Sequence, residues 1–321
     1  MRFTTTCLLV ASLMLPVAGG CGSGDSEKDA AVKPDSLVQV NFSHDNLIEA
    51  CVRLAACNVD RKPRVSDCIE NFHKRFTYFG QRKLYEALYH CANQGNGDCK
   101  VIRECLGYKG RPQNGECDKA FAAKCEDDVA HTCDLIVGGW LQALDCKKGG
   151  LKCAVRDTGS TKTAVCTIDS CNKDLFKPEC RDRKLLTCVG GAIQIDDCPA
   201  KQLQCRDPNV GLCEGTGRSC SQTSPTCKGS VVVTCEQSYL SEIDCSKVYG
   251  KKKCDPLSVS CVGAGTQCDT GGQTTFDTCE ADTLVVCIDG TLKRFDCKKM
   301  GFVGCEKAAY GAYCKAEHVY D

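Results

Sequence analysis

The 321-residue sequence has no excess of charge of either sign and no long hydrophobic run. Lys and Arg together number 41, and so do Asp and Glu. Proteins that bind nucleic acid normally carry a basic excess, so this balance argues against that class. The longest apolar run near the N-terminus, Cys7–Leu15, is too short to cross a bilayer as a helix, which needs about 20 residues.

The sequence also lacks the short motifs that mark common catalytic and metal sites. GxSxG, HExxH and P-loop motifs do not occur, and the His residues are scattered: His44, His73, His90, His131 and His318. Zinc sites usually contain CxxC pairs, which are missing here. We therefore expect a protein that is not an enzyme and that has no cofactor and no metal site. The alternative is a hidden site, which would need a non-repeated cluster of His and carboxylate residues.

Cysteine is the residue that the sequence has in abundance, with 32 copies. This density is typical of disulfide scaffolds in an oxidising compartment and argues against a cytosolic enzyme.

Residues 1–20 have the layout of a secretory signal peptide. Arg2 precedes the apolar run, and small residues follow it up to Gly20. The segment Val-Ala-Gly-Gly-Cys21 resembles the lipobox of bacterial lipoproteins, although Ala18 occupies the position where Leu is usual. The resemblance implies that Cys21 becomes the lipidated, palmitate-bearing N-terminus, and that Gly22, where a retention signal would have Asp, directs the protein to the outer membrane. The alternative is a plain signal peptide with Cys21 in a disulfide. Residues 21–42 would form a lipidated Cys and a flexible tether.

Residues 43–108 are expected to form a small helical domain stapled by disulfides. Ser43 and Asp98 are suitable N-caps, Ser66 precedes a second helix, and Gly80 precedes a third. Six cysteines lie in this segment. Proximity along the chain favours a nested pairing, although six Cys allow 15 connectivities. The favoured pairs are Cys57–Cys68, Cys91–Cys99 and Cys51–Cys105.

Basic and aromatic residues alternate in the same segment. Such a pattern can bind nucleic acid or anionic lipid, but a solvated helix face over a core of rings is the favoured interpretation. The residues are Arg61, Lys62, Arg64, Phe72, Lys74, Arg75, Phe76, Tyr78, Phe79, Arg82 and Lys83.

The remaining 24 cysteines form four sets of six, which predicts four tandem repeats. Seven residues separate the second and third Cys in every copy, and successive copies start 54, 49 and 48 residues apart. The repeats cover residues 117–166, 171–213, 220–261 and 268–314. Their cysteines are Cys117, Cys125, Cys133, Cys146, Cys153 and Cys166; Cys171, Cys180, Cys188, Cys198, Cys205 and Cys213; Cys220, Cys227, Cys235, Cys245, Cys254 and Cys261; Cys268, Cys279, Cys287, Cys297, Cys305 and Cys314.

Each repeat is expected to be a disulfide-stapled β-hairpin. Aliphatic residues precede the third Cys, and a turn such as Asp289-Gly290 follows it. A hairpin that turns there brings Cys279 near Cys297, so a bond from the second to the fourth Cys is favoured. The fold class is thus disulfide-rich small modules, a helical mini-domain followed by four hairpin repeats, with fifteen disulfides.

An Asp precedes the fourth Cys of every repeat, as Asp145, Asp197, Asp244 and Asp296. It could be a ligand for a metal or a sugar. The favoured interpretation is a turn residue that binds backbone N–H groups, because a fold position recurs in every copy whereas a single catalytic site would not.

The combined pattern resembles the cysteine-rich outer-membrane lipoproteins of myxobacterial type. These combine a lipobox, a polar tether, a Cys-rich helical segment and repeats of the form Cys-x7-Cys…Asp-Cys. The resemblance covers most of the mature chain and implies a component of the cell surface.

The repeats are also faintly similar to six-Cys chitin-binding modules. Those modules place aromatic residues where this sequence has Leu, Val or Thr, and aromatic residues make up only 6% of the chain. Trp140, Tyr310 and Tyr313 are the best remaining candidates for rings that stack on sugars.

Three functions therefore compete. The first is a structural, adhesion or protein-binding role in the cell envelope, at the periplasmic face or at the surface of the outer membrane. The second is an array that binds peptidoglycan, exopolysaccharide or a chitin-like glycan. The third is an inhibitor or sensor, which a single exposed and strained loop would favour. The expected partners are the membrane, through the lipid, and an envelope protein or glycan, but no nucleic acid.

Overall fold

The described part of the chain begins at the last residue of the predicted tether. The computed structural model describes residues 42–57, 64–73, 80–108, 117, 121, 123–134, 140–159, 161–221, 224–248, 253–268, 277–308 and 311–318. All of them belong to one unit, Gln39–Asp321. The predicted signal peptide, Cys21 and the tether before residue 42 lie outside the described residues. No described helix is long and apolar enough to cross a membrane.

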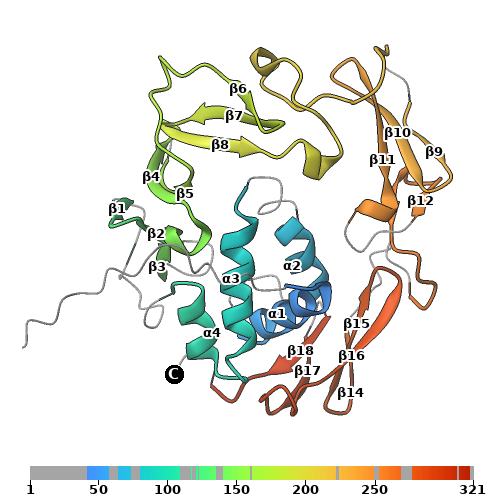
Figure 1. Cartoon of the computed structure of the whole chain (residues 1–321). Coiled ribbons are helices and arrows are strands. Elements are labelled where there is room, and N and C mark those ends of the chain that lie inside the picture. Colours follow the sequence, from blue (N-terminus) through green and yellow to red (C-terminus); the bar gives the residue numbers. More distant parts are fainter. Residues whose placement is uncertain are drawn as a thin grey trace, which may run out of the picture. The chain divides into compact units, whose positions relative to one another are not determined.

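Four short helices follow one another in the N-terminal segment (Figure 1): α1 (His44–Ala56), α2 (Val65–Asn71), α3 (Arg82–Asn93) and α4 (Cys99–Cys105). Ser43 caps α1 through a capping box with Asn46, and Asp98 accepts hydrogen bonds from the first backbone N–H groups of α4. The N-cap of α2, in contrast, is Arg64, whose side chain makes no capping bond. We refer to residues 42–108 as the helical segment.

Three disulfides staple the helical segment, but the pairing predicted from sequence proximity is wrong. The observed pairs are Cys51–Cys68, Cys57–Cys99 and Cys91–Cys105. Helices α1 and α2 pack against each other, and their contact joins residues inside the two helices. Cys68, which lies inside α2, therefore faces a residue inside α1 rather than Cys57 at the end of α1. Distance along the chain ignores this helical geometry.

Each repeat is built from β-hairpins, which confirms the predicted fold class. The strands of repeat 1 are β1 (Lys124–Glu126), β2 (Val129–Asp134), β3 (Trp140–Asp145), β4 (Lys152–Asp157) and β5 (Lys162–Thr167). Repeat 2 has β6 (Glu179–Arg181), β7 (Lys184–Val189) and β8 (Ala192–Asp196). Repeat 3 has β9 (Thr226–Lys228), β10 (Val231–Glu236), β11 (Tyr239–Asp244), β12 (Lys253–Asp255) and β13 (Ser260–Val262). Repeat 4 has β14 (Thr278–Glu280), β15 (Thr283–Ile288), β16 (Thr291–Asp296), β17 (Gly304–Ala308) and β18 (Gly311–Lys315).

The repeat contains more strands than the single predicted hairpin. Its first part is a three-stranded antiparallel sheet, such as β14-β15-β16. Its second part is a two-stranded hairpin around the fifth and sixth Cys, such as β17-β18, which repeat 2 reduces to the single bridge Gln204↔Glu214. The extra first strand explains the constant spacing of seven residues. In each copy the second Cys pairs across a two-residue turn with the residue three places before the third Cys, as Cys279 does with Leu284.

The disulfides of the repeats follow one pattern, in which the first Cys pairs with the third, the second with the fifth and the fourth with the sixth. The predicted bond Cys279–Cys297 is therefore wrong, since Cys279 pairs with Cys305. The central strand β15 separates Cys279 on β14 from the end of β16. Neighbouring strands lie about 4.8 Å apart, so two steps across a sheet exceed the reach of a disulfide.

The segment that leads into the first Cys of each repeat, or that Cys itself in repeat 2, is hydrogen-bonded to the sheet of that repeat. The backbone of Ala143 donates to Gly107 in repeat 1, Cys171 donates to Gly191 in repeat 2, Gly217 donates to Leu240 in repeat 3 and Gln267 donates to Gly290 in repeat 4. The exposed edge beside the third strand is thereby covered in every copy.

The largest core unites the helical segment with two of the repeats. It contains Leu47 and Leu84 from the helices, Ala164 from repeat 1, and Leu284 and Phe302 from repeat 4. Repeats 2 and 3 have small cores of their own, centred on Leu185 and Val232. The repeats at the two ends of the array therefore both bury apolar surface with the helices.

Candidate functional site: the contact between the helical segment and repeat 4

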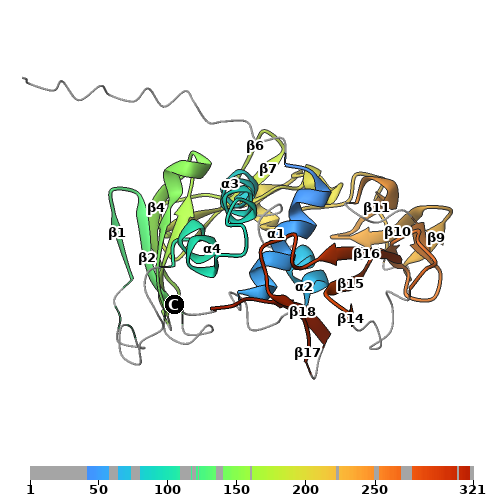
Figure 2. The same cartoon turned by 90° about the horizontal axis from the view of Figure 1, so that it is seen from below.

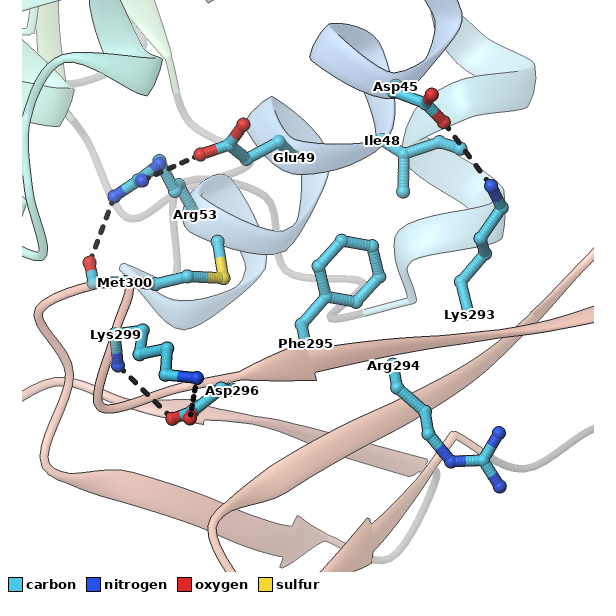
Figure 3. A pocket seen from close by; sticks show the side chains of 10 residues that line it. All are labelled: Asp45, Ile48, Glu49, Arg53, Lys293, Arg294, Phe295, Asp296, Lys299 and Met300. Carbon is cyan, nitrogen blue, oxygen red and sulfur yellow. Dashed lines mark hydrogen bonds and ion pairs between the residues drawn. The ribbon is translucent and has the colours of Figure 1, made fainter.

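A pocket lies between α1 and strand β16 of repeat 4. Its volume is about 430 Å³. Figure 3 shows that its walls carry mostly charged side chains around an apolar floor. The lining residues are Asp45, Ile48, Glu49, Arg53, Lys293, Arg294, Phe295, Asp296, Lys299 and Met300.

The charges of this pocket are largely paired with one another. Lys293 reaches Asp45 across the contact at 3.3 Å, and Lys299 lies 3.5 Å from Asp296. Arg294 points away from the other lining residues (Figure 3) and meets Glu280 at 3.4 Å. A bound ligand would have to compete with these internal partners, so the pocket serves first as a contact between two parts of the chain.

Arg53 is the buried centre of this contact, with 6% of its surface exposed. One guanidinium nitrogen donates to the backbone carbonyl of Met300 at 3.0 Å, and another donates to Glu49 at 2.8 Å. A buried charge is tolerated when it is paired and hydrogen-bonded. Arg53 thus ties α1 to the turn that follows β16.

Two glycines allow the backbones to meet at the same contact. Gly97, which follows α3, and Gly301 both have positive φ angles, of 80° and 88°. A Cβ on Gly301 would overlap the carbonyl oxygen of Asn96, and a Cβ on Gly97 would overlap that of Gly301. Only glycine permits this approach.

Asp277 supplies the cap that α2 lacks locally. It lies just before β14 in repeat 4, is 8% exposed, and accepts a hydrogen bond from the backbone N–H of Val65, the first residue of α2. Burial raises the pKa of Asp277 to about 6, although the hydrogen bond from Val65 and the charge of Arg64 act in the opposite direction. Sequence reasoning missed this residue because a cap contributed by a distant repeat leaves no local signal.

His44 adds a second titratable contact between the same parts. Its Nε2 lies 3.7 Å from the carboxylate of Asp289, in the turn between β15 and β16. The histidine stands at the first position of α1, so this ion pair forms in the protonated state of the imidazole.

No family model, curated protein or solved structure matches this chain.

The recurring Asp residues share one role, although the N–H donor is two residues on in repeats 1 and 3 and three residues on in repeats 2 and 4. Their carboxylates accept backbone N–H bonds from Lys147, Ala200, Ser246 and Lys299, at 3.0–3.2 Å, where the chain turns after the third strand of each sheet. Hydrogen bonds from Ser246 lower the pKa of Asp244, and the backbone bond from Lys299 lowers that of Asp296. Among the described residues no group of three or more His, Cys, Asp or Glu could hold a metal.

Two described members of the basic and aromatic pattern lie in different surroundings. Phe72 packs in the core against Phe42 and Tyr89, and Arg82 pairs with Glu86 on its own helix at 2.6 Å. The remaining members of the basic and aromatic pattern include residues 61, 62, 74–76, 78 and 79, which lie outside the described residues.

The candidate sugar-stacking rings are distributed over two repeats. Trp140 begins β3 in repeat 1. Tyr313 lies on β18, opposite Glu306 on β17, and burial first and then the nearby carboxylate of Glu306 raise its pKa. Tyr310 lies outside the described residues.

One turn protrudes from the array in repeat 3. Leu257 is 95% exposed at the tip between β12 and β13. Val259 beside it has a φ of 44°, which is an unusual value for a β-branched residue. Asp255 holds the turn by accepting from the backbone N–H and the hydroxyl of Ser258, at 3.0 and 2.7 Å. Disulfides fix Cys254 and Cys261 at its base. This is an exposed, strained loop of the kind that would suit an inhibitor.

Proposed function

We propose that the protein is a lipid-anchored component of the bacterial cell envelope with a non-catalytic structural, adhesion or protein-binding role. Fifteen disulfides fit an exported or extracellular protein, and this supports a place in the cell envelope. Anchoring to the outer membrane through Cys21, and kinship with the lipoproteins of myxobacterial type, are the further parts of the proposal.

The number of cysteines that remain outside the disulfides supports the proposed anchor. Fifteen disulfides take thirty of the 32 cysteines, and the two that remain are Cys7 and Cys21. Cys7 lies within the predicted signal peptide. Once that peptide is cleaved, Cys21 has no cysteine left to pair with inside the chain, which suits a residue that carries lipid. Several acyl chains bind a membrane stably where one does not.

The anchor is tested by expressing the full chain in a Gram-negative host and measuring the intact mass of the membrane-associated protein. We expect cleavage before Cys21 and added mass from acyl chains, with incorporation of labelled palmitate. Cys21→Ser should abolish both. Cys7→Ser is the matched control, since it alters the other cysteine outside the disulfides and should leave lipidation intact. Unlipidated wild-type protein would contradict the anchor.

The role of the body of the protein is tested by binding. The soluble mature chain is incubated with insoluble glycans and with whole cell envelopes, before and after protease treatment of the envelopes. We expect retention only on envelopes that still contain protein. Retention on purified peptidoglycan or chitin would instead support the glycan-binding array and overturn the protein-binding role.

The protruding turn at Leu257 favours a second candidate function, in which the chain inhibits or docks to another protein. An apolar tip held by two disulfides loses little conformational freedom on binding. Leu257→Asp should then abolish binding or inhibition in a panel of secreted proteases. Leu175→Asp is a matched control, because Leu175 is 78% exposed in repeat 2. Equal effects of both variants would contradict this candidate.

A further inference from the structure

We propose that the contact between the helical segment and repeat 4 is a pH-responsive clasp, closed in mildly acidic surroundings and loosened at neutral pH. Such a device goes beyond an anchoring or binding role, because it would let the protein change with the acidity around it. Helix α1 lies against β18 of repeat 4, and α2 contacts β15 (Figures 1 and 2).

The clasp is held without covalent bonds. Every disulfide of the described chain lies either inside the helical segment or inside one repeat, so none crosses this contact. The polar bonds that cross it include the hydrogen bond from Arg53 to Met300 and the bond from Val65 to Asp277. The ion pair of Lys293 with Asp45 and the pair of His44 with Asp289 cross it too, beside the apolar core that the helices share with repeat 4. The contact can therefore open while each part stays stapled.

Asp277 makes the contact sensitive to pH. Its carboxylate is buried against the start of α2, and Oδ2 has no hydrogen-bond partner among the described residues. The charged groups of α2 that act on it are Arg64, which favours the carboxylate, and Asp67, which opposes it. Because burial raises the pKa to about 6, the group is neutral and well tolerated below that pH. Above it, a poorly solvated negative charge lies within the contact.

Protonation of His44, the first residue of α1, strengthens the contact as protonation of Asp277 does. The imidazolium form of His44 attracts the carboxylate of Asp289, whereas the neutral imidazole does not. Both groups therefore tighten the contact on protonation. Other charged groups line the two faces of the contact. They are Asp45, Glu49 and Arg53 on α1, and Lys293, Arg294, Asp296 and Lys299 on repeat 4.

Hydrogen exchange of the mature full chain measures the opening directly. Amide protection is compared at about pH 5 and pH 7.5, after correction for the intrinsic exchange rate, in α2, in β18 and in β7 of repeat 2 as the internal reference. We expect protection in α2 and β18 to fall by about tenfold or more at the higher pH, since one unit of pKa shift corresponds to a tenfold change. Protection in β7 should stay constant.

The variant Asp277→Asn carries a neutral side chain at every pH and should keep α2 and β18 protected at pH 7.5. Asp174→Asn, at an exposed position of repeat 2, is the matched control and should behave as wild type. His44→Gln should remove part of the pH dependence.

Hydrogen exchange of the wild-type protein tests the clasp even if the Asp277 variant does not fold. Equal protection of α2 and β18 at both pH values would overturn the clasp. A parallel loss in β7 would do so too, since it would indicate global destabilisation.

Discussion

The carboxylate of Asp277 accepts a hydrogen bond from the backbone N–H of Val65, so a residue of the last repeat caps a helix some two hundred positions earlier. A helix without a local cap gains its N-terminal partner only when the two parts meet. The folding of α2 and the docking of repeat 4 are thus linked through one side chain.

This linkage predicts how stability depends on pH. The folded-state pKa of Asp277, about 6, lies above its ordinary value of 3.8. Its contribution is therefore fully present below about pH 4 and is lost as the pH rises through 6, a change of about 3 kcal/mol. Other carboxylates have lowered pKa values and make the folded state more stable as the pH rises. Their effect cancels when the variant is compared with wild type at each pH. The melting temperature of Asp277→Asn minus that of wild type should rise from pH 4 to pH 7. A constant difference would contradict the account.

Arg53 and Arg82 form a natural matched pair for a second prediction. Each pairs with a Glu four residues away on its own helix, but only Arg53 is buried and bonded to Met300. Arg53→Ala leaves a buried carbonyl without its donor and should cost roughly 2–4 kcal/mol of unfolding free energy. Arg82→Ala should cost about 0.5 kcal/mol or less. Denaturant unfolding compares the two, and similar losses would show that Arg53 has no special place in the contact.

Much of the fold could be predicted because it is encoded locally. Six cysteines per repeat and the fixed spacing of seven residues define the modules, and Ser43 and Asp98 mark the starts of α1 and α4. These signals require only neighbours in the chain. The class of the fold follows from them without any knowledge of tertiary contacts.

The disulfide pairing and the site could not be predicted from the sequence. The pairing depends on which strand lies between two cysteines, and the site depends on contacts between segments that are far apart in the chain. Cys279 does not meet Cys297 because β15 separates their strands. The pair of Asp277 with Val65 joins segments that no local pattern connects. Gly301 looks like an ordinary turn glycine in the sequence, and its role emerges only from the backbone of Asn96 opposite it.

Alanine substitutions at Gly301 and Gly211 distinguish two costs: the clash of a new Cβ with a neighbouring backbone, and the strain of a positive φ angle. Both have positive φ angles, of 88° and 70°, but nothing lies within 4 Å of a Cβ added to Gly211. Gly211→Ala should cost about 1–2 kcal/mol for the left-handed conformation alone. Gly301→Ala should cost roughly 1–3 kcal/mol more, because the methyl group also pushes against the backbone of Asn96. Chemical denaturation measures both, and hydrogen exchange in α3 and β18 should report loosening for Gly301→Ala only.

The disulfide pattern gives the most direct chemical prediction. Non-reducing proteolysis and mass spectrometry should recover peptides that join Cys279 to Cys305 and Cys297 to Cys314, and none that joins Cys279 to Cys297. The double variant Cys279→Ala/Cys305→Ala opens a span of 26 residues and should lower stability by roughly 2–4 kcal/mol. The matched variant removes Cys180 and Cys205, at the same place in repeat 2 and with a span of 25. Loop entropy is then equal, so any extra loss in the first variant measures how strongly repeat 4 depends on its packing with the helices. Equal losses would mean that the shared core adds nothing to the stability of repeat 4.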